Sequence, residues 1–238
     1  MKEEMTASGF LVNDPSTSPI AQLMLAHGAG APMDSPFMNL LAAALAARGV
    51  RVLRFEFPYM AERRRTGGKR PPNPMSVLEQ AFRLQAAQLQ GRFFVGGKSM
   101  GGRVASMLAA EVGAAGFVCF GYPFHPPGKP ERMRTEHLGV LQCPGLVVQG
   151  TRDPFGKPEE VAGYDLDPAL GLHWLDGGEH DFRPLKASGL EQRDLIEQAA
   201  DAAAAFMAGL TRALRPTRFR RRALPASPQQ TWCPNGGL

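Results

Sequence analysis

Residues 94–102 read FVGGKSMGG, the most informative segment of the chain. At its centre Ser99 occupies the pattern G-x-S-x-G. The apolar residues 93–95 lead into this pattern as a predicted strand, and residues 100–112 leave it as a predicted amphipathic helix. A serine in this context sits on a sharp, strained turn, and the glycines beside it avoid collisions with neighbouring backbone. The context therefore favours a nucleophilic serine over a glycine-rich turn that holds a serine by chance.

We call the strand–turn–helix segment at residues 94–102 the elbow. Predicted strands and helices alternate on both sides of it. Ser35 is the expected N-cap of the first helix, and Ser76 with Glu79 forms a capping-box pattern for the second. The strands are expected at residues 20–26, 51–57, 92–96, 116–121, 145–150 and 172–175, and the helices at residues 35–49, 76–89, 100–112 and 191–210. This alternation predicts an α/β fold with a mostly parallel sheet, helices on both faces, and ligands at the carboxyl ends of the strands.

A serine hydroxyl needs a base to become a nucleophile, and the base needs a carboxylate that orients it. In a fold of this kind these groups follow the serine in the order acid, then histidine. Asp153 follows the strand at 145–150, and His180 follows the last strand, so both fall where the order requires them. Two alternatives stay open for the acid: Asp176 also ends a strand, and Asp153 could serve only as a turn former. The remaining histidines do not follow the last strand: His27, His125, His137 and His173.

Acyl transfer also requires two backbone N–H groups that face the developing oxyanion. One is expected from Met100, the residue after the nucleophile. The other is expected from the loop HGAGA at residues 27–31, where Ala29 is the candidate donor and Gly30 the near alternative. A simple tight turn is the competing interpretation of this loop.

The connection at residues 122–144 is the only place where a lid could be inserted between the nucleophile helix and the acid. It is long enough for a loop and one short helix, so we expect no lid domain and a shallow, open site. Tyr122, Phe124 and His125 are the predicted substrate-binding residues at its rim, with a packed, proline-rich connection as the alternative. Lys98 is expected to be exposed beside the elbow, with a role in steering anions as the alternative.

Five motifs together resemble one known family. They read LAHGAG, GGKSMGGR, GYPFHPP, QGTRDPFG and GGEHDF, at residues 25–30, 96–103, 121–127, 149–156 and 177–182. The chain is similar to a bacterial α/β-hydrolase group related to testis-expressed protein 30 and to subunit 3 of the non-specific-lethal chromatin complex, and more distantly to dienelactone hydrolases. The resemblance covers about residues 20–210 and implies a triad of Ser99, Asp153 and His180. It implies no settled substrate, and the dienelactone class does not transfer because those enzymes use a cysteine where this chain has Ser99.

The composition of the chain agrees with one folded domain. Its 238 residues are 44% apolar and 21% charged, which is ordinary for a globular protein. No apolar run approaches the roughly 20 residues that span a bilayer, and the acidic residues 3–4 do not suit a signal peptide. We therefore expect a cytoplasmic protein without a membrane partner. The three cysteines, Cys119, Cys143 and Cys233, fit neither a disulfide framework nor a metal site, so neither a metal nor a cofactor is expected.

The net charge of +5 comes from two segments. Residues 212–222 hold six arginines and no acid, and the loop predicted at 63–70 is also basic, whereas the rest of the chain is net acidic. The basic loop could attract an acidic substrate, but solvated charge is the interpretation we favour. The predicted division is an N-terminal segment at 1–19 in which a short edge strand could form, an α/β-hydrolase domain at 20–212, and a disordered basic tail at 213–238. We expect no nucleic-acid partner for this tail, and the patterns do not determine an oligomeric state.

These features predict a serine hydrolase that forms an acyl-enzyme on a small ester, thioester or amide. The partner is then a small acyl substrate. Two other functions remain alternatives: a catalytically idle interaction module with this fold, and nucleic-acid binding through the basic tail. A complete triad argues against the idle module, because a scaffold has no need of all three groups.

Overall fold

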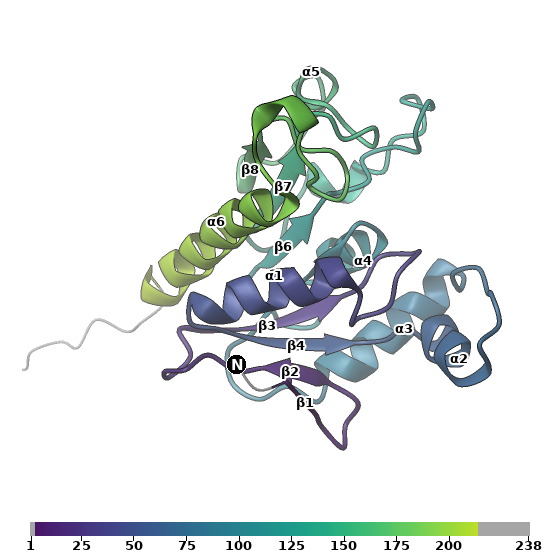
Figure 1. Cartoon of the computed structure of the whole chain (residues 1–238), viewed down its shortest axis with the longest axis vertical. Helices are drawn as coiled ribbons and strands as arrows, with labels where there is room; N and C mark the ends of the chain where they lie inside the picture. Colours follow the sequence, from purple (N-terminus) through teal and green to yellow (C-terminus); the bar gives the residue numbers. More distant parts are fainter. Residues whose placement is uncertain (1–2, 214–238) are drawn as a thin grey trace, which may run out of the picture.

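The structure, a computed structural model, describes residues 3–213. Within this range the strands form one sheet of eight, in the order β1-β2-β4-β3-β5-β6-β7-β8 (Figure 1). The strands are β1 (Glu3–Met5), β2 (Leu11–Asn13), β3 (Ala21–Ala26), β4 (Val50–Phe55), β5 (Phe94–Lys98), β6 (Phe117–Phe120), β7 (Gly145–Gly150) and β8 (Leu170–Leu175). Strands β3 to β8 pair in parallel, and β1 and β2 are antiparallel. All six predicted strands are present, and the prediction of a mostly parallel sheet is confirmed.

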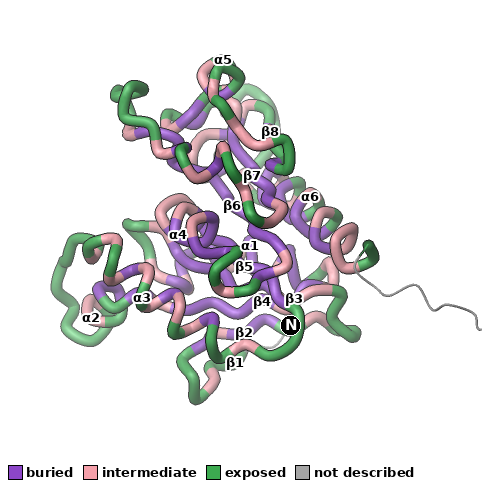
Figure 2. The backbone as a smooth tube through the Cα atoms, turned by 180° about the vertical axis from the view of Figure 1, so that it is seen from behind, coloured by how far each residue is buried: buried purple, intermediate pink, exposed green. Residues whose placement is uncertain are grey.

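Helices cover both faces of this sheet. Helices α1 (Pro36–Ala47) and α6 (Gln192–Ala213) lie side by side on one face, and α3 (Met75–Ala86) and α4 (Met100–Leu108) lie on the other (Figure 1). Consecutive side chains of β3 point to opposite faces of the sheet, as they do in any β-strand. Leu23 packs in the core under α1 and α6, whereas Met24 packs in the core under α3 and α4. Strands β5, β6 and β7 are buried along their whole length (Figure 2), with apolar side chains on both faces.

The structure adds elements that the patterns did not predict. Residues 58–66 form helix α2 (Pro58–Thr66), so the first half of the predicted basic loop is helical. Pro58 suits the first turn of this helix, and Gly67 ends it with a φ of 70°. The helix lacks an apolar stripe, and apolar periodicity therefore could not reveal it. In the N-terminal segment, where one short edge strand was predicted to be able to form, the structure has two: β1 at the edge of the sheet, and β2, which pairs with β4.

Two predicted helix starts differ in detail from the structure. Ser35 is the N-cap of α1, but its side chain makes no capping hydrogen bond. Helix α3 begins one residue before Ser76, with Pro74 as its N-cap, so the capping box predicted there does not form. The backbone of Pro74 accepts the first N–H bonds of that helix, and the helix does not require the serine hydroxyl.

The connection between β6 and β7 contains one short 3₁₀ helix, η1 (Glu136–Leu138), and no lid domain. Two further short helices lie beyond it, α5 (Pro158–Val161) and η2 (Lys186–Ser188). No helix within residues 3–213 is long and apolar enough to cross a membrane. The predicted disordered tail lies outside the described residues except for residue 213, which ends α6.

Candidate active site

The elbow at Ser99 has the strained geometry that its sequence pattern indicates. Ser99 joins β5 to α4 with φ 50° and ψ −114°, backbone angles that residues other than glycine rarely adopt. The glycines around it allow close backbone contact. A Cβ atom on Gly97 would lie 2.4 Å from the carbonyl carbon of Gly101, and one on Gly101 would lie 2.5 Å from the His27 oxygen. The turn therefore requires glycine at both positions.

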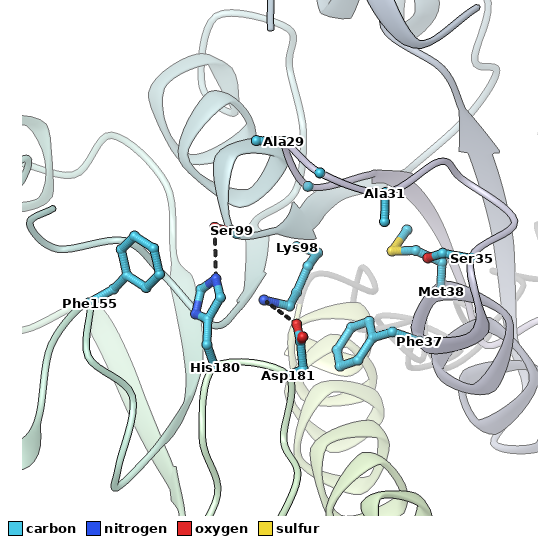
Figure 3. A pocket seen from close by; sticks show the side chains of 12 residues that line it. Ala29, Ala31, Ser35, Phe37, Met38, Lys98, Ser99, Phe155, His180 and Asp181 are labelled. Atoms are coloured by element: carbon cyan, nitrogen blue, oxygen red, sulfur yellow. Dashed lines mark hydrogen bonds and ion pairs between the residues drawn. The ribbon is translucent and has the colours of Figure 1, made fainter. Parts of the chain in front are cut away.

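The structure brings Ser99, His180 and Asp153 into one hydrogen-bonded chain. The His180 Nε2 atom lies 3.0 Å from the Ser99 Oγ atom (Figure 3), and the His180 Nδ1 atom lies 2.7 Å from Asp153 Oδ2. The Asp153 carboxylate is fully buried, and its Oδ1 atom accepts the Phe155 N–H at 2.9 Å. An ionised carboxylate only accepts hydrogen bonds, so His180 carries its proton on Nδ1 and presents Nε2 as an acceptor to the serine.

The loops after β7 and β8 hold Asp153 and His180 against each other. The backbone N–H of Arg152 donates to the Gly178 oxygen at 2.9 Å. A Cβ atom on Gly150 would lie 2.3 Å from that oxygen, so the two loops are in direct backbone contact. The alternative acid Asp176 lies at the end of β8, and its carboxylate accepts the Thr151 hydroxyl at 3.5 Å. It forms no hydrogen bond with His180, so the geometry favours Asp153.

The loop at residues 28–31 lies beside Ser99, as the candidate oxyanion loop should. Its carbonyl groups are turned toward the protein. The Tyr59 hydroxyl donates to the Ala29 oxygen at 2.8 Å, and the His27 Nδ1–H donates to the Gly28 oxygen at 2.7 Å. His27 is neutral in this role, because burial lowers its pKa and its Nε2 atom accepts the Phe57 N–H. Sequence reasoning did not assign these supports: Tyr59 meets the loop only in the fold, and the role of His27, the first residue of the loop itself, was not recognised.

The two candidate oxyanion donors are available for a ligand. Neither the N–H of Ala29 nor the N–H of Met100 meets an acceptor within residues 3–213. Met100 begins α4, and the first N–H groups of a helix have no partner inside the helix. The assignment of these donors, with Gly30 as the alternative to Ala29, stays a prediction.

A cavity of about 330 Å³ adjoins the serine (Figure 3). Ser99, His180 and Phe155 lie at one end, and Phe37 and Met38 of α1 lie at the other. The complete lining is Gly28, Ala29, Gly30, Ala31, Ser35, Phe37, Met38, Lys98, Ser99, Phe155, His180 and Asp181. The α1 residues were not predicted to line the site, although α1 follows the oxyanion loop directly in the chain and that order was a usable signal.

Lys98 lies inside this cavity, which corrects the prediction that its side chain is exposed. Only 7% of the side chain is exposed, and the Nζ atom lies 3.4 Å from Asp181 Oδ1. The ring of Phe37 lies beneath the ammonium, with its centroid 5.4 Å from Nζ. Burial lowers the pKa of Lys98, and the nearby Asp181 carboxylate opposes that shift.

The predicted rim residues Tyr122, Phe124 and His125 do not line the cavity, and this prediction is wrong. All three are buried, with at most 2% of each residue exposed. The Tyr122 hydroxyl donates to the Arg134 oxygen, the Phe124 ring packs on the Tyr122 ring, and the His125 ring faces Glu160. Both the N–H and the C=O of Tyr122 bond to the side chain of Gln149 in β7, which holds the start of this connection against the sheet. The alternative of a packed connection describes it correctly.

Other reactive groups near the elbow are inert or absent. Cys119 is fully buried next to α4, its Sγ donates to the Gly102 oxygen, and burial raises its pKa. The thiol is therefore not a competing nucleophile. Within residues 3–213 no group of three His, Cys, Asp or Glu side chains is placed to hold a metal ion.

Comparison with known proteins places this geometry in a family. A family model described as an alpha/beta hydrolase domain matches residues 19–208. The esterase domain of a Rhodothermus marinus protein shares 16% identity and a TM-score of 0.61, over 84% of this chain and 92% of that one. A serine hydrolase without a lid from Xanthomonas campestris shares 19% identity and a TM-score of 0.54, over 92% and 90% of the two chains. Dienelactone hydrolase from Anabaena variabilis shares 19% identity and a TM-score of 0.60, over 89% and 97%. Because the family model spans most of the chain, this protein belongs to the α/β-hydrolase family.

Proposed function

We propose that the protein is a serine hydrolase that cleaves a small ester, thioester or amide through an acyl-enzyme on Ser99. The observation that carries the proposal is the chain of hydrogen bonds from Ser99 to His180 to Asp153, at 3.0 and 2.7 Å. Ser99 and His180 line a cavity with room for an acyl group. The esterase and hydrolase neighbours support the same reaction class.

The mechanism follows from the direction of these bonds. The Ser99 Oγ atom attacks the carbonyl carbon while His180 Nε2 takes the hydroxyl proton, and Asp153 stabilises the resulting imidazolium. The carbonyl oxygen becomes an oxyanion that the N–H groups of Ala29 and Met100 would stabilise, and one such donor contributes about 100- to 1,000-fold in rate. His180 then passes the proton to the leaving group. A water molecule then attacks the acyl carbon while His180 Nε2 takes its proton, and Ser99 leaves as His180 returns the proton to it.

The size of the site supports a small acyl group. A cavity of about 330 Å³ is at the lower end of the range for small-molecule sites. The connection after β6 carries no lid that could enclose a long chain. The resemblance to testis-expressed protein 30 and to the chromatin-complex subunit leaves an idle interaction module as the second candidate.

Labelling with a fluorophosphonate probe distinguishes the two candidates, because the probe reacts only with an activated serine. We expect the wild-type protein and Ser76→Ala, which changes an exposed serine on α3, to be labelled and to hydrolyse 4-nitrophenyl butyrate. The variant Ser99→Ala should not be labelled, and its kcat should fall by several orders of magnitude. A wild-type protein that is folded but neither labelled nor active would favour the interaction module.

A further inference from the structure

Lys98, the residue before Ser99 in the chain, carries a buried amino group into the cavity that Ser99 also lines. Its side chain is 7% exposed and lines the same cavity as Ser99 and Phe37 (Figure 3). Burying an ammonium group is costly unless hydrogen-bond acceptors replace the water that it loses. Core packing alone therefore does not account for a lysine at this position, where a methionine would fill the same space without the cost.

The protein itself supplies only part of what this ammonium needs. An ammonium has three N–H donors. Within residues 3–213 the Nζ atom meets one acceptor, Asp181 Oδ1, at 3.4 Å. Charge-assisted N–H···O bonds are usually about 2.7–2.9 Å long, and the Asp181 side chain is 45% exposed to solvent. The Phe37 ring face accepts no conventional hydrogen bond. Donors of Lys98 thus remain available on the cavity side.

The Lys98 ammonium is also close to the His180 ring. A Cβ atom on Gly121 would lie 3.2 Å from Lys98 Nζ and 3.3 Å from His180 Nδ1, so both nitrogens flank the same point of the backbone. A substrate acylated on Ser99 would extend into a cavity whose other walls are largely apolar, formed by Ala31, Phe37 and Met38. An anionic oxygen on a short acyl chain would find its strongest partner in Lys98.

We propose that Lys98 binds a carboxylate carried by the acyl group, so that the enzyme prefers half-esters of short dicarboxylic acids over neutral esters of the same size. This inference rests on the proposed function. The reaction consumes one water and releases the free dicarboxylate and the alcohol, with no other reactant. Lys98 acts here as a specificity-determining residue, since it touches the substrate away from the bond that breaks.

Asp181 has the opposite effect on such a substrate. Its carboxylate holds Lys98 in the empty cavity, but it repels a second carboxylate that approaches the same ammonium. Two other carboxylates raise the pKa of Lys98 by their charge: Asp153, which is hydrogen-bonded to His180, and Glu179, two residues before Asp181. Removing the charge of Asp181 should therefore strengthen the preference for the anionic ester, while removing the charge of Lys98 should abolish it.

The test compares 4-nitrophenyl hemiglutarate with methyl 4-nitrophenyl glutarate, a neutral ester of nearly equal size, after subtraction of uncatalysed hydrolysis. The measured quantity is the ratio of the two kcat/KM values. We expect the wild type to favour the half-ester, and Lys98→Met to lower the ratio by about tenfold to a hundredfold, the range for a hydrogen bond to a charged group. Asp181→Asn should raise the ratio, and Lys69→Met, which removes an exposed charge on the basic segment, should leave it unchanged.

Equal losses on both esters in Lys98→Met, or a wild-type ratio near one, would overturn the inference. Glutarate itself provides a second measurement that does not depend on catalysis. It should raise the melting temperature of the wild type and of Ser99→Ala, and it should not raise that of Lys98→Met. If no ester is cleaved but glutarate still stabilises the wild type, the proposed function fails and the carboxylate site remains. If esters are cleaved without a glutarate effect or an anionic preference, the carboxylate site fails alone.

Discussion

The substitution Asp153→Asn replaces one carboxylate oxygen of the proposed triad acid by an NH₂ group. The structure determines which oxygen is replaced. The Phe155 N–H donates to Oδ1 at 2.9 Å, so the amide oxygen of the asparagine must stay there. The NH₂ group then takes the place of Oδ2, 2.7 Å from His180 Nδ1. The Nδ1 atom must accept this bond, the ring proton moves to Nε2, and His180 can no longer accept the Ser99 proton.

The expected cost is large because the site offers no compensation. Asp153 is fully buried, so water cannot reach His180 Nδ1 to restore the tautomer. A carboxylate-to-amide change of this kind in a serine triad lowers kcat by about 10,000-fold, equivalent to about 5 kcal/mol of transition-state stabilisation. The assay is the kcat for 4-nitrophenyl butyrate near pH 8, with circular dichroism to show that the fold is unchanged.

Asp176→Asn is the matched control, because Asp176 also follows a parallel strand, β8, and within residues 3–213 its carboxylate meets only the Thr151 hydroxyl. Its kcat should stay within about threefold of the wild type, since surface changes rarely exceed a few tenths of a kcal/mol. An Asp153→Asn variant that keeps more than a tenth of the wild-type kcat would refute this reasoning. A slower Asp176→Asn variant would move the acid to the end of β8.

Two further predictions concern stability. Burial lowers the pKa of His137 to about 4 from 6.5, so above pH 6.5 the ring is neutral in both states, and below it the unfolded chain takes up the proton first. The free energy of unfolding should therefore fall by about 2 kcal/mol between pH 7.5 and 4.5, after allowance for the partly exposed ring. Urea titrations should show this loss to be smaller in His137→Gln, and an identical slope would contradict it. Gly101→Ala forces a Cβ to within 2.5 Å of the His27 oxygen, and should destabilise the protein by about 3 kcal/mol or more. Gly209→Ala, whose Cβ meets nothing within 4 Å, should be neutral or stabilising. Equal melting temperatures for the two variants would argue against the close backbone contact at Gly101.

The mostly parallel sheet, and the order of the candidate triad residues at its strand ends, could be predicted from local patterns of residues. Apolar strands alternate with amphipathic helices, and this pattern has few solutions other than a parallel sheet covered on both faces. Ser99, Asp153 and His180 each follow a predicted strand, and the carboxyl ends of parallel strands meet at one edge. Local patterns were sufficient for these conclusions because each residue's place depends on the strand just before it.

The surroundings of these residues follow from contacts between distant parts of the chain. Phe37 forms part of the cavity because the first turn of α1 lies beside the loop at residues 28–31. Tyr122 lies outside the cavity because Gln149, 27 residues later, binds its backbone. Lys98 looks like an exposed cation in the sequence, yet Phe37 and Asp181 enclose it. Burial and side-chain direction depend on partners that are distant in the chain, and no local pattern of residues records them.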